Sequence, residues 1–299
     1  MLHIKTLSAS DTEAICRIHQ AAAALDPGFP AIAAPHWQRF VSSPLNENGR
    51  LFRTAQLHGQ LVGVASCSLR LLGPTAIKHF RIVVDPPFRR RGVGRALLAE
   101  LVAIPVEASE VCLQTVVDGR WDAARAFVEF FGFQILESEV EMHCPPMTSP
   151  ELTLSANITQ IEITPAQARG LARLHNEAYR DTASFVPMTP DSFRKSVEED
   201  DRFFVLRIDE QIVGYAHIVP GSKALWLESL VVSETHRGQG LGSELLCHVL
   251  ATAAMESVIV RLQVTDANRP ALSLYRKLGF LTDSISHRYR ILEQVLRRV

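Results

Sequence analysis

The sequence of 299 residues contains one internal repeat of domain length, and this repeat limits the folds that the chain can adopt. Residues 89–94 (RRRGVG) correspond to residues 237–242 (RGQGLG) at an offset of 148, and residues 131–133 (FGF) correspond to residues 278–280 (LGF) at an offset of 147. Solenoid repeats are only about 20 to 50 residues long, so this spacing indicates the duplication of a whole domain. The chain length also predicts two domains of roughly 150 residues each.

A proline-rich segment separates the two copies. Residues 145–150 read Pro-Pro-Met-Thr-Ser-Pro and have no hydrophobic periodicity, which is typical of a linker. We therefore expect an N-terminal domain at residues 1–145, a linker at residues 146–157 and a C-terminal domain at residues 158–299.

Within each copy the hydrophobic period alternates between two and the helical spacing, which predicts strands and helices in mixed order. In the second copy we expect strands at 203–208, 212–219, 224–232 and 258–264, helices at 241–255 and 270–278, and a last strand. The first copy repeats the strands at 51–57, 61–70, 78–84 and 111–117 and the helices at 94–104 and 121–131. Short turns at 58–60 and 209–211 predict a hairpin in each copy. The predicted fold class is α/β (α+β), with two consecutive domains that each contain a sheet flanked by helices.

Composition argues against several other classes of protein. The chain has 31 Lys and Arg against 32 Asp and Glu, so we expect no nucleic-acid partner. Its five cysteines are widely separated and form no pairs at zinc spacing, which predicts buried thiols in a reducing compartment and no metal site. Charges interrupt every apolar run before membrane-spanning length, and the N-terminus has no leader-like pattern, so we expect a soluble, cytoplasmic protein with no membrane partner.

A glycine-rich loop between a strand and a helix is a candidate anion site. In the second copy Gly238, Gly240 and Gly242 alternate behind Arg237, ahead of an amphipathic helix. In such a loop, successive backbone N–H groups and the positive end of the helix dipole converge on an anion, and glycine lets the ligand approach closely. The loop lacks the Lys-Ser/Thr of a nucleoside triphosphate site and the acidic partner of a dinucleotide site. Glycine clusters also make ordinary turns, so a simple turn is the alternative.

Two motifs in the second copy resemble those of the GNAT superfamily of acyl-CoA N-acyltransferases. They are R-x-x-G-x-G at the start of a helix and, further along the chain, N-x-x-A-x-x-x-Y-x-x-x-G-F. The matching residues are Arg237, Gly240, Gly242, Asn268, Ala271, Tyr275, Gly279 and Phe280. The resemblance covers almost the whole chain, once per half. It implies in each half a mixed, mostly antiparallel sheet that is splayed between its fourth and fifth strands, with acetyl-CoA in the cleft as co-substrate.

The resemblance also implies roles for individual residues. Tyr275 would donate a proton to the coenzyme sulfur, with packing over the cofactor as the alternative. Glu228 would be the general base; it shares a face with Trp226 and Leu230 if the pleat is regular, and it needs burial or a water relay to act on an amine. An exposed carboxylate, or one that orients a cationic substrate, is the alternative. Asn268 suits both helix capping and a cofactor contact. The expected coenzyme contacts are Leu230, Val231, Val232, Arg237, Gly238, Gln239, Gly240, Leu241, Gly242, Asn268 and Tyr275.

The first copy departs from this pattern where the chemistry would occur. Alignment of the repeats places Val128 opposite Tyr275 and Phe80 opposite Glu228, so the acid and the base are both missing. Trp121 stands opposite Asn268. We therefore expect a catalytically degenerate domain whose loop either still binds the coenzyme or is a solvated surface segment. Its expected coenzyme contacts are Val83, Val84, Arg89, Arg90, Arg91, Gly92, Val93 and Gly94.

Other residues are expected to have supporting roles. Helices at 166–180 and 184–199 should shape the acceptor pocket. His19 and His175 occupy equivalent places on the first helix of each copy and are expected to pack or cap. The residues that fall where the family builds its acceptor wall are Trp37, Phe40, Phe185 and Phe193.

These observations predict an N-acyltransferase that transfers an acetyl group from acetyl-CoA to a primary amine of a small molecule or peptide. The attack is expected to be direct, within a ternary complex, in the C-terminal domain. A non-catalytic acyl-CoA sensor and a scaffold in which both loops are simple turns are the alternatives. The two domains would pair within a monomer, or the chain would form a homodimer.

Overall fold

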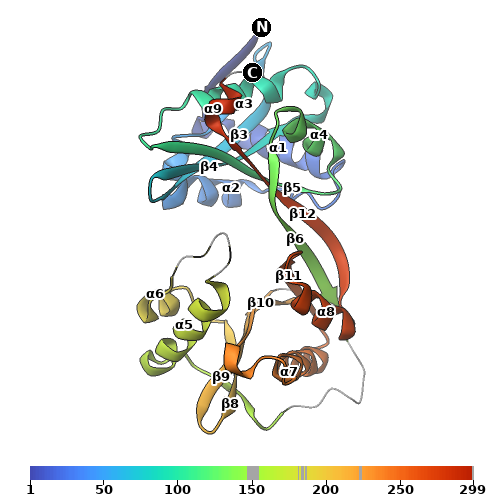
Figure 1. Ribbon diagram of the computed structural model, residues 1–299. Helices are drawn as coiled ribbons and strands as arrows, with labels where there is room; N and C mark the ends of the chain where they lie inside the picture. The colour runs from blue at the N-terminus through green and yellow to red at the C-terminus, as the bar shows by residue number, and fades with distance from the viewer. Residues whose placement is uncertain (147–154, 181, 183–184, 186, 222–223, 298–299) are drawn as a thin grey trace. The chain divides into compact units, whose positions relative to one another are not determined.

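The computed structural model describes the chain except for residues 147–154, 181, 183–184, 186, 222–223 and 298–299 (Figure 1). It divides into two compact units. The first unit comprises Met1–Ser138 and Ile285–Val299, and the second unit comprises Glu139–Ser284. Most of the expected linker at 146–157 lies outside the described residues.

The first unit is a mixed sheet with helices. Its strands, in spatial order, are β1 (Leu2–Thr6), β2 (Arg53–Leu57), β3 (Gln60–Leu72), β4 (Thr75–Val84), β5 (Glu110–Asp118) and β12 (Leu281–Leu292). Its helices are α1 (Thr12–Ala23), α2 (Ala34–Ser42), α3 (Val93–Ala103), α4 (Asp122–Phe130) and α9 (Glu293–Leu296). The β4–β5 pair is parallel and the other pairs are antiparallel, as the predicted fold class requires.

The second unit repeats this plan. Its strands, in spatial order, are β7 (Ile158–Ile161), β8 (Arg202–Ile208), β9 (Gln211–Pro220), β10 (Ala224–Val232), β11 (Ile259–Thr265) and β6 (Gln134–Cys144). Its helices are α5 (Pro165–Tyr179), α6 (Pro190–Lys195), α7 (Leu241–Glu256) and α8 (Arg269–Lys277). Helix α6 is much shorter than the expected helix at 184–199, because Pro190 starts it and Thr189 caps it with Ser192.

The last strands of the two copies are exchanged between the units. Residues 139–144 of β6 pair with β11 in the second unit, and residues 286–292 of β12 pair with β5 in the first unit. The sequence-based bounds count each last strand with its own copy, whereas the compact units do not. Alternating hydrophobicity identifies a strand but does not say which sheet it joins.

Both sheets are splayed at the same place. The parallel β4–β5 ladder runs only from Thr75 opposite Glu110 to His79 opposite Gln114, and the β10–β11 ladder runs only from Ala224 opposite Ile259 to Leu227 opposite Leu262. All four strands continue beyond these ladders. The expected opening between the fourth and fifth strands is therefore present in each unit.

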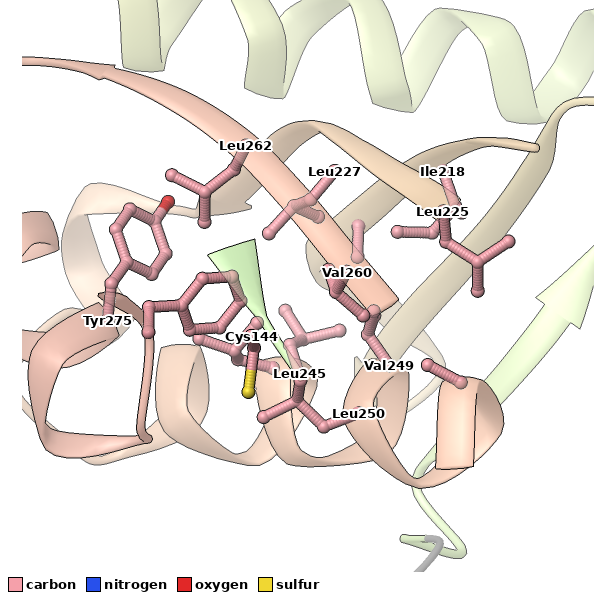
Figure 2. Close-up of a cluster of buried hydrophobic side chains, with 14 of the residues drawn as sticks. Cys144, Ile218, Leu225, Leu227, Leu245, Val249, Leu250, Val260, Leu262 and Tyr275 are labelled. Atoms are coloured by element: carbon pink, nitrogen blue, oxygen red, sulfur yellow. The ribbon is translucent and has the colours of Figure 1, made fainter. Parts of the chain in front are cut away.

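The core of the second unit lies between its sheet and α7 (Figure 2). Buried side chains from α7 (Leu245, Val249 and Leu250) face buried side chains from β10 and β11 (Leu225, Leu227, Val260 and Leu262). Each such side chain contributes roughly 1.5–3 kcal/mol when fully buried, so the core holds α7 firmly against the splayed strands. Tyr275 of α8 lies at the edge of this cluster with its hydroxyl on the side of Leu262 (Figure 2).

None of the described helices is long and apolar enough to cross a membrane.

Candidate active site

The two glycine-rich loops have the same backbone shape. Gly240 (φ 83°) precedes α7 and Gly92 (φ 79°) precedes α3, and neither helix has a side-chain cap. Two residues earlier, Gly238 (φ 77°) and Arg90 (φ 62°) are also left-handed. A Cβ on Gly240 would meet no atom within 4 Å, so the loop is open beside this glycine, and no side chain caps the first N–H groups of α7. This arrangement can accept the phosphates of a nucleotide-type ligand.

The first arginine of each loop is tied to the end of the preceding strand. Arg237 donates from Nε to the Val232 carbonyl (3.2 Å), and Arg89 donates from Nε to the Val84 carbonyl (3.3 Å). Arg89 also makes a bidentate ion pair with Asp26 (3.1 and 2.5 Å). Both side chains shape the loop, and their expected contact with the coenzyme stays a prediction.

Strand β10 contains a bulge at Glu228. Leu227 pairs with Ile218 and Ser229 pairs with the next residue along β9, His217, so Glu228 has no partner of its own. The bulge breaks the regular pleat on which the shared face with Trp226 depended, and the Glu228 side chain is exposed. Burial therefore does not support a base role for this carboxylate, and such a role would need the water relay.

The first unit has no bulge at the equivalent place. Strands β3 and β4 stay in one register from Gly63 opposite Val84 to Leu72 opposite Thr75. Phe80, which stands opposite Glu228 in the repeat, is buried. The difference between the two copies therefore extends from the side chains to the backbone of the fourth strand.

Tyr275 is held in a nearly enclosed position on α8. It is 7% exposed and packs against Phe280 (5.6 Å between ring centroids). Burial raises the pKa of its phenol, and Tyr179 nearby raises it further, so Tyr275 stays protonated at neutral pH. Asn268 caps the helix, accepting from the Ala271 N–H at 3.2 Å, so the capping role expected for it is confirmed.

A partly buried polar network lies on the α5 side of β10, and the sequence analysis did not identify it. We call it the tyrosine–serine network; its members are His175, Tyr179, Tyr215 and Ser229. The His175 Nδ1 and the Tyr215 hydroxyl are 3.1 Å apart. Burial raises the pKa of both tyrosines, and hydrogen bonding with Ser229 partly offsets that rise. Burial also lowers the pKa of His175, which favours its neutral imidazole.

The network adjoins both predicted catalytic residues. Ser229 directly follows Glu228, and the Tyr179 phenol lies close enough to affect the pKa of Tyr275. The spacing of His175 and Tyr179, one helical turn apart on α5, was the available sequence signal. Of the expected acceptor wall, Phe193 is buried against Phe203 and Tyr215 and belongs to the core.

The first unit contains two adjoining cavities. The larger, of about 720 Å³, is lined by residues 80–84 of β4, the loop at 89–95, Thr115 to Val117 of β5, and α4. The smaller, of about 290 Å³, is lined by residues of the expected acceptor wall, Trp37 and Phe40, and by His19. Val128, in the place of Tyr275, lines the larger cavity and has no proton to donate.

Among the described residues, no three His, Cys, Asp or Glu side chains gather as metal ligands would.

Two protein-family models match the chain without overlapping. One, described as the acetyltransferase (GNAT) family, matches residues 168–280, and the other, described as the acetyltransferase (GNAT) domain, matches residues 48–135. The two matches lie in different halves of the repeat.

Similar proteins cover most of the chain. A mycothiol acetyltransferase from Clavibacter sepedonicus is 27% identical over 266 residues, which span 83% of this chain and 86% of that protein. Another from Salinispora tropica is 28% identical over 254 residues, 80% of each chain.

Two solved structures have the same fold. A GCN5-related N-acetyltransferase from Sphaerobacter thermophilus has a TM-score of 0.74 at 19% identity and covers 98% of this chain and 96% of its own. A tandem GNAT protein from the clavulanic acid biosynthesis pathway has a TM-score of 0.72 at 18% identity, with 98% and 99% covered.

Proposed function

Since this chain belongs to the GNAT acetyltransferase family and carries two such domains in tandem, we propose that it transfers the acetyl group of acetyl-CoA to a primary amine, with the active site in the second unit. The observation that carries this assignment is the difference between the two openings. In the second unit, bulged Glu228 and protonated Tyr275 belong to the strand and the helix beside the opening. In the first unit, Phe80 and Val128 stand in their places.

The coenzyme would be held by backbone groups of the second unit. The uncapped N–H groups after Gly240 would bind its diphosphate. Beyond Leu227, β10 is no longer paired with β11, so the backbone near Leu230, Val231 and Val232 can bind the pantetheine arm on that side. An N–H of the same stretch, at Leu230 or Val231, would polarise the thioester carbonyl.

The chemical step would be a direct attack within a ternary complex. The amine nitrogen forms a bond to the acyl carbon, and the bond from that carbon to sulfur breaks. The amine proton passes to Glu228 through water, because this carboxylate is exposed. Tyr275 donates its phenolic proton to the departing sulfur, which releases coenzyme A as the thiol.

For the first unit we propose binding of a coenzyme without turnover. Its loop repeats the left-handed positions and the uncapped helix start of the second unit, and a cavity of about 720 Å³ opens in front of it. Residues of both the strand and the loop that were expected to contact the coenzyme line this cavity, including Val83, Val84, Arg90 and Gly92.

The acceptor is proposed to be a small-molecule amine. The relatives from C. sepedonicus and S. tropica carry the name mycothiol acetyltransferase, so the acceptor of that reaction is the first to test. The experiment incubates the protein with acetyl-CoA and a panel of small amines and peptides while free thiol is measured. Thiol release that depends on one amine, and that Tyr275→Phe suppresses, supports the proposal. Tight coenzyme binding without thiol release for any amine of the panel would favour a sensor. The absence of coenzyme binding would favour a scaffold.

A further inference from the structure

The two cavities of the first unit meet at one unpaired arginine. Residues that line both are Phe80, Arg81, Val83, Thr115 and Val116, where β4 and β5 separate. Arg81 makes no hydrogen bond or ion pair with any described residue. Its side chain is exposed to solvent at the place where the two cavities meet. Its guanidinium can therefore pair with an anionic group that enters either cavity.

The walls around Arg81 supply no carboxylate to pair with it. The larger cavity is also lined by Arg89, Arg90 and Arg95, and its one acidic lining residue, Asp26, is already bound to Arg89. The smaller cavity is lined by no Asp or Glu among the described residues. The lining is therefore suited to an anionic ligand, and Arg81 can pair with an anionic group at the junction of the two cavities.

The position of Arg81 on β4 indicates which part of the ligand carries this charge. At the offset of 148 it corresponds to Ser229, which directly follows the bulged Glu228. If the first unit binds a coenzyme as proposed above, its phosphates lie at the loop and its acyl group lies near Arg81. An acetyl group has no charge and would make no ion pair with the guanidinium, whereas a carboxylate would.

We propose that the first unit binds an acyl-CoA whose acyl chain ends in a carboxylate, and that Arg81 pairs with this carboxylate. The chain would pass from the larger cavity towards the smaller one. His19 lines the smaller cavity with a buried Nδ1 that has no partner among the described residues, and as a neutral acceptor it would repel a carboxylate. The carboxylate is therefore placed at Arg81. Because Val128 replaces the acid, the ligand is bound and not consumed. This inference rests on the proposed coenzyme binding by the first unit.

The tryptophans provide a reporter that is specific for the first unit. The chain has three, of which Trp37 lines the smaller cavity, Trp121 lines the larger one, and Trp226 lies in the second unit. In the full-length Trp226→Phe variant the remaining fluorescence reports on the two cavities alone. Succinyl-CoA and butyryl-CoA are the probes, because their acyl chains have the same number of carbons and differ in the terminal carboxylate.

Succinyl-CoA is expected to bind on the order of 10- to 100-fold more tightly than butyryl-CoA, as measured by titration of this fluorescence. Arg81→Met should remove the difference, Arg81→Lys should retain part of it, and Arg70→Gln, an exposed arginine on β3 outside both cavities, should leave it unchanged. Equal affinity for the two probes in the Trp226→Phe protein would overturn the inference and leave the proposed coenzyme binding intact. The absence of any response to acetyl-, butyryl- or succinyl-CoA would overturn both. The comparison of the two probes does not depend on whether the Arg81 variants fold.

Discussion

The side chains of Lys78 and Glu293 form an ion pair inside the first unit, with Nζ 2.5 Å from Oε2, although 215 positions separate the two residues in the sequence. Both are buried. Lys78 also donates to the carbonyls of Leu101 and Ile104 at the end of α3 (2.9 and 2.7 Å). The last residues of the chain therefore neutralise a charge that caps a helix of the first copy.

Removal of this carboxylate should destabilise the first unit strongly. We expect Glu293→Ala to lower the free energy of unfolding by about 3 to 5 kcal/mol, because it leaves the buried Lys78 ammonium without its counter-ion. Urea unfolding followed by circular dichroism measures the change. The exposed Glu107→Ala is the matched control and should stay within about 0.5 kcal/mol of the parent protein. The double variant Lys78→Met, Glu293→Leu should recover most of the loss; if it does not, the ion pair is not the cause.

The strand exchange predicts that the first copy does not fold alone. A fragment of residues 1–145 lacks the part of β12 that pairs with β5 and lacks the partner of Lys78. We expect this fragment to give no cooperative unfolding transition, whereas a fusion of residues 1–138 to residues 285–297 through a flexible linker should give one. A stable, cooperative 1–145 fragment would contradict the exchange.

The sequence predicted the elements of the site better than its details. The repeat, the hairpins and the glycine-rich loops follow from patterns in the sequence, the resemblance to the GNAT family implies the splay, and the structure contains all of them. The bulge at Glu228 depends on the pairing with β9, which one strand's sequence does not encode. The tyrosine–serine network joins a helix and two strands, so it depends on tertiary packing. The exchange of β6 and β12 could not be predicted from strand patterns, because alternating hydrophobicity identifies a strand without identifying its partner strand.

The buried His19 predicts acid sensitivity of the first unit. Burial lowers the pKa of this imidazole to about 4, against 6.5 for the unperturbed group. The folded state therefore favours the neutral form, and the contribution to stability is fully present above pH 6.5 and is lost as the pH falls towards 4. This shift is worth about 3 kcal/mol at 1.36 kcal/mol per pKa unit. We expect urea unfolding between pH 7 and pH 4 to show this loss, and His19→Gln to reduce it. The exposed His3→Gln should leave the pH dependence unchanged.

The tyrosine–serine network should stabilise the second unit through Ser229. Ser229→Ala removes the polar group beside the Tyr179 and Tyr215 phenols that lowers the pKa of both, so we expect the free energy of unfolding to fall by about 1 to 3 kcal/mol. The exposed Ser273→Ala on α8 is the control and should be nearly neutral. Equal effects of the two substitutions would show that the network contributes nothing beyond the loss of a hydroxyl.

Tyr275→Phe tests the proposed acid directly. The substitution keeps the ring that packs on Phe280 and removes only the phenolic proton, so coenzyme affinity should change little while turnover falls by roughly 10²- to 10⁴-fold. Because burial raises the pKa of this phenol, the parent enzyme should keep its acid protonated above pH 10, and no loss of kcat below that pH should arise from Tyr275. The control is Tyr179→Phe, which also removes a phenol beside the site but not the proposed donor, and it should cost much less turnover. If Tyr275→Phe retains the parent kcat, or if Tyr179→Phe costs as much, the proton reaches the sulfur from another group.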